Sequence, residues 1–232
     1  MAPERAPLAA FPYTSGPMEL TASETRVLGC LLEKQLATPN AYPLTLNALV
    51  TAANQTSNRE PIVNYDDAEV VDALNGLRQK GVARVVLGSG QRAEKYRHVL
   101  EDVWGLDEQH RAVLAVMMLR GPQTVGELRQ RTERLARFDS LGEVEQVLRL
   151  LANREEPFAR RLERAPGQKE ARWVELFSGE AAALEAATRA EPGDDGEDGP
   201  RPRSATDALR EEVAALRDEV AALREELRAL LE

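Results

Sequence analysis

The amino-acid sequence predicts a mainly α-helical chain with small β-hairpins, an α+β protein, and three observations support this class. Two segments share one apolar pattern, Ala68–Leu77 and Gly142–Leu151, and the second begins 74 residues after the first (142 − 68). Each segment is followed by a turn containing Gly or Pro and by two short basic strands. Near the C-terminus, apolar residues recur at heptad spacing. Three helices followed by a hairpin is the winged-helix order, so the sequence predicts two tandem winged-helix domains and a C-terminal coiled-coil helix.

The first predicted domain covers residues 18–102 and begins with a helix-capping signal. Thr21 and Glu24 form a capping box, in which a hydroxyl and a carboxylate satisfy backbone N–H groups at a helix start. Apolar residues recur at helical spacing from Val27, and two prolines separate this helix from a second one over Leu44 to about Ala53. The elements expected next are a helix from about Asp66 to Lys80 and strands over Val82–Leu87 and Lys95–Leu100.

The second predicted domain covers residues 103–179 and repeats this plan. Three capping signals mark its helix starts, namely Asp107, the pair Thr124 and Glu127, and the pair Ser140 and Glu143. The helix that follows Thr124 is expected to be short and rich in arginine. The elements expected last are a helix ending near Asn153 and strands over Phe158–Arg164 and Ala171–Phe177.

Composition separates three further segments from these domains. Residues 1–17 are rich in Pro and Ala and are expected to form a disordered tail. Residues 180–203 contain an Ala-rich stretch followed by an acidic stretch rich in Gly and Pro. This composition cannot bury a core, so we expect a flexible, charge-extended linker. Residues 204–232 are expected to form a parallel dimeric coiled coil.

The coiled-coil prediction rests on spacing and on charge. The apolar residues alternate in steps of four and three, with Val at two a positions and Leu at every d position, a mixture that favours two parallel strands. Every g position is Glu and every e position is Arg, which a parallel homodimer pairs across its interface. The alternative is a single amphipathic helix docked on the rest of the chain. The expected dimerisation residues are Leu209, Val213, Leu216, Val220, Leu223, Leu227 and Leu230.

The composition favours a cytoplasmic protein. One cysteine in 232 residues excludes an intramolecular disulfide and gives no support for an oxidising compartment. The chain starts without the basic segment and apolar run of a signal peptide. No apolar stretch approaches the roughly 18 residues that a membrane span needs.

The net charge of −9 comes mainly from the C-terminal part of the chain. Residues 17–180 carry 22 basic and 24 acidic side chains, whereas residues 181–232 carry 7 and 14. The part that is expected to fold is therefore close to neutral, which neither excludes nor favours a nucleic-acid partner.

Neither catalysis nor metal binding is expected. Cys30 lies between leucines of a helix, where a thiol packs as a small apolar group. His98 and His110 have no cysteine, histidine or carboxylate at ligand spacing. Gly88–Gly90 lacks the Lys-Ser/Thr of a phosphate-binding loop and is expected to be a hairpin turn. We expect no enzyme, no catalytic residue, no cofactor and no metal site.

Basic side chains on the two hairpins are the candidate nucleic-acid contacts. Cations on a projecting hairpin can reach backbone phosphates, and an amide at the hairpin tip can enter a groove. The alternative is a solvated hairpin with ordinary surface arginines. The candidates are Arg84, Gln91, Arg92, Lys95 and Arg97 in the first hairpin, and Arg160, Arg161, Arg164, Lys169 and Arg172 in the second.

The third helix of each predicted domain argues against the standard mode of reading DNA. In helix-turn-helix proteins the N-terminal half of this helix contacts base edges. Carboxylates fill that half in both copies, and they repel phosphates. We therefore favour contacts led by the hairpins. The carboxylates are those of Asp66, Asp67, Glu69 and Asp72 in one copy, and of Glu143 and Glu145 in the other.

The polar connection Asn54–Pro61 has two interpretations. In one, its amides, its hydroxyls and Arg59 hold a phosphate or the backbone of a partner. In the other, the same groups fix a long connection through hydrogen bonds from side chains to the backbone. The sequence does not decide between these, so Arg59 is a further candidate contact.

Several uncommon short motifs follow one another along the chain, namely Gly29–Gln35, Thr38–Pro39, Tyr42–Leu44, Asn54–Gln55 and Asn58–Pro61, followed by Leu151–Glu155 and Pro166–Gly167. In this order they resemble the YceH family of bacterial proteins, over about residues 18–178. The resemblance implies a cytoplasmic tandem winged-helix protein, for which a DNA-binding role is inferred from the fold.

Together these expectations describe a non-enzymatic, cytoplasmic, transcription-regulator-like protein. It would bind double-stranded DNA, associate with itself through its C-terminal coiled coil and have no membrane contact. One alternative is a protein-interaction scaffold, like the winged-helix adaptors of chromosome segregation. A second alternative is association with RNA or the ribosome.

Overall fold

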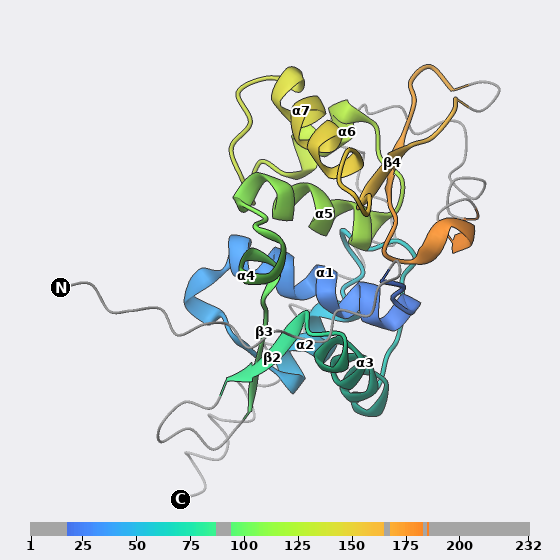
Figure 1. Ribbon diagram of the computed structural model, residues 1–232. Coiled ribbons are helices and arrows are strands. Elements are labelled where there is room, and N and C mark those ends of the chain that lie inside the picture. Colours follow the sequence, from blue (N-terminus) through green and yellow to red (C-terminus); the bar gives the residue numbers. More distant parts are fainter. Residues whose placement is uncertain (1–17, 87–93, 165–167, 183–184, 186–232) are drawn as a thin grey trace, which may run out of the picture. The chain divides into compact units, whose positions relative to one another are not determined.

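Helices dominate the part of the chain that the computed structural model describes, namely residues 18–86, 94–164, 168–182 and 185. Two small antiparallel sheets accompany them there (Figure 1). The predicted class, mainly α with small β-structure, is confirmed at this level. The predicted N-terminal tail, the coiled coil, most of the acidic linker and both Gln91 and Arg92 lie outside the described residues. Across the described segments, no helix has the length and apolar character to cross a membrane.

The first half of the described chain is arranged around α1 (Ala22–Ala37). Its three strands form an antiparallel sheet in the order β1-β3-β2, in which Tyr96 of the middle strand faces Leu44 on one side and Val85 on the other. The other elements are η1 (Pro39–Ala41, a 3-10 helix), β1 (Leu44–Thr45), α2 (Leu46–Ala53), α3 (Asp67–Gln79), β2 (Ala83–Val86), β3 (Lys95–His98) and α4 (Leu100–Trp104).

The second half repeats the order of helices and hairpin without a counterpart of β1. Its elements are α5 (Glu108–Arg120), α6 (Val125–Arg131), α7 (Leu141–Ala152), β4 (Ala159–Arg161) and β5 (Trp173–Glu175). The two strands are antiparallel, with Ala159 opposite Glu175 and Arg161 opposite Trp173. A separate bridge joins Gln123 to Trp173 and ties the hairpin to the segment before α6.

Most of the predicted capping signals have the predicted geometry. Thr21 with Glu24 and Thr124 with Glu127 form complete capping boxes, and the Asp107 side chain accepts from the backbone N–H of His110. Only one of the two hydrogen bonds of the predicted capping box at Ser140 is present. Its hydroxyl accepts from Glu143 N, but the Glu143 carboxylate accepts from the backbone N–H of Asp139 instead of Ser140.

Several predicted elements differ from the observed ones. Both strands of the second hairpin, Ala159–Arg161 and Trp173–Glu175, are shorter than the predicted Phe158–Arg164 and Ala171–Phe177. Leu44 and Thr45 are strand residues and do not begin a helix, because they pair with β3 and the Thr45 hydroxyl caps α2 through the Ala48 N–H. The second strand of the first hairpin ends at His98 and does not reach Leu100. Leu100 begins the short helix α4, which ends at Gly105 in a left-handed conformation with φ 64°.

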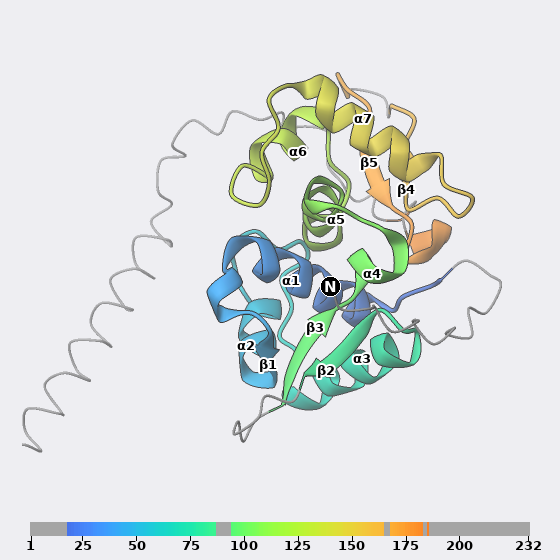
Figure 2. The ribbon, with the colours of Figure 1, turned by 60° about the vertical axis from the view of Figure 1, so that its left-hand side comes forward.

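The two halves share one hydrophobic core. Helices α1 and α5 lie side by side in both views (Figures 1 and 2). A Cβ atom added at Gly29 of α1 would lie 3.0 Å from Leu119 Cδ2 and 3.1 Å from Met118 Cβ of α5. Glycine at this position therefore allows the two helices to approach closely without displacing Leu119 or Met118. Backbone hydrogen bonds from Glu60 N to Leu119 O at 2.8 Å and from Leu20 N to Phe177 O at 2.6 Å also join the halves.

Candidate nucleic-acid interface

The β4–β5 hairpin, α6 and α7 line a surface hollow of about 740 Å³. The α7 residues that line the hollow are Leu141, Glu145 and Arg149, which are spaced four residues apart and therefore share one helix face. Cations outnumber carboxylates in the lining. The basic residues, which we call the second-hairpin cations, are Arg149, Arg161, Arg164 and Lys169, and the acidic ones are Glu145 and Glu170.

The second-hairpin cations all lie at the protein surface. Arg164 Nη1 donates to the backbone oxygen of Lys169 at 3.4 Å. Arg149 pairs with Glu145 at 3.2 Å, and both side chains are more than half exposed. Exposed pairs at this helical spacing contribute only about 0.3–0.5 kcal/mol. The pair therefore presents a small barrier to the movement of Arg149 toward a phosphate.

Strand alternation gives the neighbouring Arg160 a different environment. Arg160 lies opposite Val174 in the sheet, whereas Arg161 lies opposite Trp173. Successive side chains of a strand point to opposite faces, so Arg160 and Arg161 cannot both face the hollow. Arg160 instead pairs with Glu180 beyond the end of β5.

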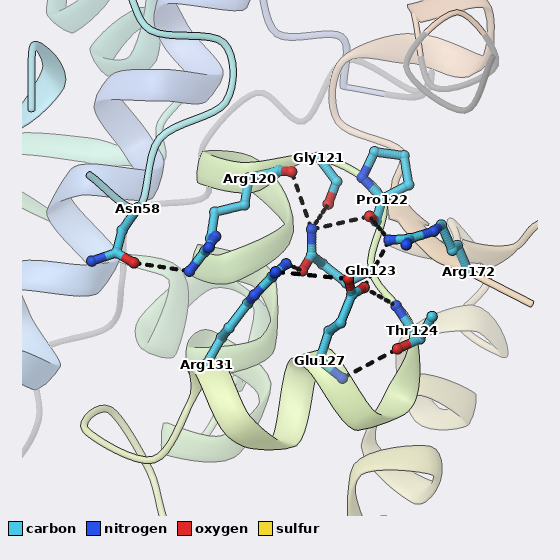
Figure 3. A network of polar contacts seen from close by, with 9 residues as sticks. All are labelled: Asn58, Arg120, Gly121, Pro122, Gln123, Thr124, Glu127, Arg131 and Arg172. Carbon is cyan, nitrogen blue, oxygen red and sulfur yellow. Dashed lines mark hydrogen bonds and ion pairs between the residues drawn. The ribbon is translucent and has the colours of Figure 1, made fainter. Parts of the chain in front are cut away.

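Arg172 belongs to an internal polar network (Figure 3). Its side chain is 12% exposed, and its Nη1 donates to Glu127 Oε2 at 2.7 Å and to Pro122 O at 3.0 Å. The same carboxylate oxygen accepts from Thr124 N and so completes the cap of α6. Gln123 Nε2 donates to the backbone oxygens of the adjacent turn. Arg172, the residue before β5, therefore links this strand to the start of α6, and its charge is satisfied inside the protein.

The first hairpin offers fewer accessible cations among its described residues. Arg97 pairs with Asp102 at 3.1 Å, and Arg84 lies opposite Arg97 in the sheet. Lys95 lies at the end of β3 nearest the hairpin tip. Arg84 also lines a second hollow of about 480 Å³, together with Asn75, Arg78, Gln79, Gly81 and Ala83.

Arg59 is buried, in contrast to the predicted contacts on the hairpins. Its Nη1 and Nη2 donate to the two carboxylate oxygens of Glu33 at 3.0 and 2.7 Å, and its Nε donates to Ala52 O at 3.0 Å. Burial alone would lower the pKa of Arg59, but the hydrogen bonds and charge of Glu33 raise it. Arg59 therefore has no accessible charge to offer a phosphate, and this geometry favours the interpretation in which the polar connection is fixed internally.

Other residues of the Asn54–Pro61 connection make the same kind of contact. Asn54 donates to Tyr65 O and accepts from Tyr65 N, both at 2.8 Å. The carbonyl side-chain oxygen of Asn58 accepts from Arg120 Nη1 at 2.8 Å. Asn58 has a φ of 58°, a conformation that asparagine tolerates better than most residues. The connection is held in place by α1, α2 and α5.

Carboxylates surround the start of α3, as the sequence predicts. Asp66 and Glu69 form a reciprocal capping box with both bonds at 2.9 Å, and Asp67 and Asp72 are exposed beside them. The positive end of the helix dipole is thereby neutralised by the protein itself. This end of α3 is consequently a poor site for a phosphate.

The predicted non-catalytic residues lie in packed or capped positions. Cys30 is fully buried, and burial raises the pKa of its thiol to about 11. His98 is buried, and His110 Nδ1 lies 2.7 Å from Asp107 Oδ1 at a helix start. Within the described residues, no three His, Cys, Asp or Glu side chains converge in the manner of a metal site.

Sequence reasoning missed two kinds of residue. Arg149 lies in the repeated segment, 74 residues after Asn75 (149 − 75), and its exposed position in the helical pattern was a usable signal. Glu33 and Glu127 hold Arg59 and Arg172 inside the protein, over sequence separations of 26 and 45 residues. No local pattern indicates which arginine each of these carboxylates will pair with.

The sequence is similar to a protein family and to several bacterial proteins. A family described as "Protein of unknown function, DUF480" matches residues 20–168. A UPF0502 protein of Geobacter metallireducens is 55% identical over 160 residues, which cover 69% of this chain and 73% of the relative. A UPF0502 protein of Solibacter usitatus is 46% identical over 196 residues, covering 84% and 92%. One of Chromobacterium violaceum is 47% identical over 168 residues, covering 72% and 76%.

Proposed function

This chain belongs to the DUF480 family of proteins of unknown function, and we propose that it binds double-stranded DNA without catalysing a reaction. The family resemblance indicated by the short motifs is confirmed. The family description and the names of the relatives state no activity, so the proposal rests on geometry and on charge.

The proposed architecture is a tandem winged helix. Support comes from the order of elements in each half, where three main helices precede an antiparallel pair of strands, as in α1–α2–α3–β2–β3 and α5–α6–α7–β4–β5. The third helix and the hairpin of each half border a hollow, so both elements could contact one duplex.

The observation that carries the DNA proposal is the group of second-hairpin cations. Four cations and two carboxylates line one hollow on an exposed face. Guanidinium and ammonium groups on a projecting surface suit backbone phosphates, whose contacts position a protein without reading sequence. We propose Arg149, Arg161, Arg164 and Lys169 as phosphate contacts, with Arg84 and Lys95 as the corresponding contacts of the first hairpin.

The proposed pose differs from that of a standard helix-turn-helix protein. The capped, acidic start of α3 repels phosphates, so the hairpins approach the duplex first. Arg59 and Arg172 take no part because their charges are satisfied internally. Gln91 and Arg92 remain proposed contacts of the first hairpin tip.

The heptad residues 209–230 are proposed to join two chains as a parallel coiled coil. Two linked copies would raise the effective concentration of each binding unit at the duplex and so increase the overall affinity. Changing Leu216 and Leu223 to Lys should convert a dimer to a monomer in light scattering. A variant that stays dimeric would place the interface elsewhere.

The DNA proposal is tested by titrating a labelled duplex with the full chain and recording fluorescence anisotropy. The double variant Arg161→Ala/Arg164→Ala should bind at least about tenfold more weakly, since each lost phosphate contact removes about one released counterion. The matched control is Arg137→Ala, because Arg137 is a strongly exposed cation that does not line the hollow. Equal affinity of the double variant and the control would exclude the hollow as the binding surface.

A second candidate function is a scaffold for protein–protein contacts, and one observation favours it. Leu150 of α7 is 52% exposed and, unlike Leu141, does not line the hollow of the second-hairpin cations, so it offers a separate apolar contact for a protein partner. Under this alternative, Leu150→Ser should abolish recovery of a specific partner, whereas Arg161→Ala/Arg164→Ala should leave that recovery intact.

A further inference from the structure

A cavity of about 220 Å³ lies at the seam between the two halves. Residues of α1, of the 60–65 segment, of the end of α5 and of the segment around β5 line it. Ligand pockets usually measure about 300–1,000 Å³, and each water-sized group takes about 30 Å³. The cavity therefore suits a small molecule of roughly seven water-sized groups. Its apolar lining includes Val63, Met117, Met118 and Val174.

Arg26 brings an uncompensated positive charge to this cavity. Its side chain is buried, with the residue 4% exposed, and its donors reach the backbone oxygens of Ala53 and Pro61. In the described part of the chain, no carboxylate lies within ion-pair distance of it. Neutral carbonyls leave the charge itself unbalanced, and a guanidinium has five N–H donors, more than these two bonds use. Burial accordingly lowers the pKa of Arg26.

Glu175 brings an uncompensated negative charge to the same cavity. The residue is 6% exposed, and its carboxylate accepts from Ser178 Oγ at 2.7 Å, Phe177 N at 2.6 Å and Ser178 N at 3.2 Å. No cationic side chain of the described residues pairs with it. An ionised carboxylate accepts about four hydrogen bonds, so one position is open. Burial raises the pKa of Glu175, as expected for a carboxylate without a counter-charge.

Opposite buried charges on one small cavity match a zwitterion. We propose that this cavity binds a free α-amino acid with a small aliphatic side chain, its carboxylate toward Arg26 and its ammonium toward Glu175. The apolar side chain would lie against Met117 and Met118. The paired hydroxyls of Thr25 and Ser178, 3.1 Å apart, offer further hydrogen bonds from both halves. Glu60 also lines the cavity, but it is exposed and its charge is screened by water. The proposal is independent of DNA binding.

The ligand class is tested on the unaltered full chain by thermal unfolding and calorimetry. L-valine and L-leucine serve as probes, compared with isovalerate, which lacks the ammonium group, and isobutylamine, which lacks the carboxylate. At about 100 times its Kd an amino acid should raise the Tm by about 5 °C or more. Each analogue should bind at least about tenfold more weakly, because one buried charge then stays unpaired.

A variant then assigns the ammonium contact. Glu175→Gln keeps the size of the side chain and removes its charge, and it should weaken amino-acid binding at least about tenfold. The control Glu180→Gln changes a nearby exposed carboxylate that does not line the cavity and should bind as the unaltered chain does. The proposal is overturned if neither amino acid binds below about 10 mM, or if an analogue binds as tightly as an amino acid. Amino-acid binding by Glu175→Gln equal to that of the unaltered chain also overturns it. If Glu175→Gln does not fold, the analogue series alone decides.

Discussion

Protonation of His98 should make the protein markedly less stable in mild acid. The imidazole is buried in β3, its Nε2 lies 2.7 Å from Gln35 Oε1, and its Nδ1 accepts from the backbone N–H of Leu100 at 3.3 Å. These partners fit a neutral ring with its proton on Nε2. Burial lowers the pKa of His98 to about 3, and the charges of Arg111 and Arg97 contribute to the same shift.

The direction and size of the effect follow from proton linkage. The unfolded chain takes up a proton at His98 below a pKa of about 6.5, whereas the folded chain keeps the ring neutral down to about 3. The contribution of His98 to the free energy of unfolding is therefore fully present above about pH 6.5. It is lost as the pH falls, by up to about 1.4 kcal/mol per pH unit. Between about pH 7.5 and pH 5 the loss is about 2 kcal/mol in the free energy of unfolding.

The assay is guanidinium chloride unfolding, followed by tryptophan fluorescence at both pH values, for the unaltered chain and for His98→Gln. The variant has a lower stability of its own, but its side chain does not titrate. Contributions from Glu33, Asp107 and Glu175 are common to both proteins and cancel in the comparison. The unaltered chain should lose about 2 kcal/mol more than the variant on acidification. Equal losses, within about 0.5 kcal/mol, would refute the reasoning.

Three further predictions concern the interior. Gly76→Ala should lower stability by about 1 kcal/mol in urea unfolding. Its Cβ would lie 1.9 Å from Glu24 Oε1 and displace a buried carboxylate that caps α1 and pairs with Lys80, a loss larger than the roughly 1 kcal/mol that Ala gains over Gly in a helix; a more stable variant contradicts this. Arg59→Ala should cost about 3 kcal/mol by leaving the Glu33 carboxylate with Lys34 as its remaining cationic partner, while the folded variant binds DNA normally; weakened DNA binding would show that Arg59 belongs to the interface. Cys30 should react with an aromatic disulfide reagent only after unfolding, and rapid reaction of the native chain would contradict its burial.

Local sequence rules predicted the helices because their signals join residues that are close in the chain. The boxes at Thr21 and Thr124 are completed three residues later, and the apolar spacing that follows depends only on the helical repeat. The same local rules misjudged Leu44 and Thr45. Their conformation is decided by pairing with β3, about 50 residues further along the chain, which no local rule detects.

The candidate site was predicted less completely, because exposure of an arginine is a tertiary property. The sequence shows that arginines are abundant near both hairpins, but it does not show that Arg59 meets Glu33 or that Arg172 meets Glu127. Arg161 faces the hollow, and its neighbour Arg160 pairs with Glu180. That difference of a single position depends on strand register, which the folded sheet fixes.

The most direct test of the DNA-binding proposal is a residue-level map of the contact surface. Backbone amide shifts of the isotopically labelled full chain would be recorded during titration with a short duplex. The largest changes should fall in β4, in the 168–172 segment and on the Glu145–Arg149 face of α7, with little change around Arg59 and at the start of α3. Changes concentrated at the start of α3, or a hairpin that does not respond, would contradict the account.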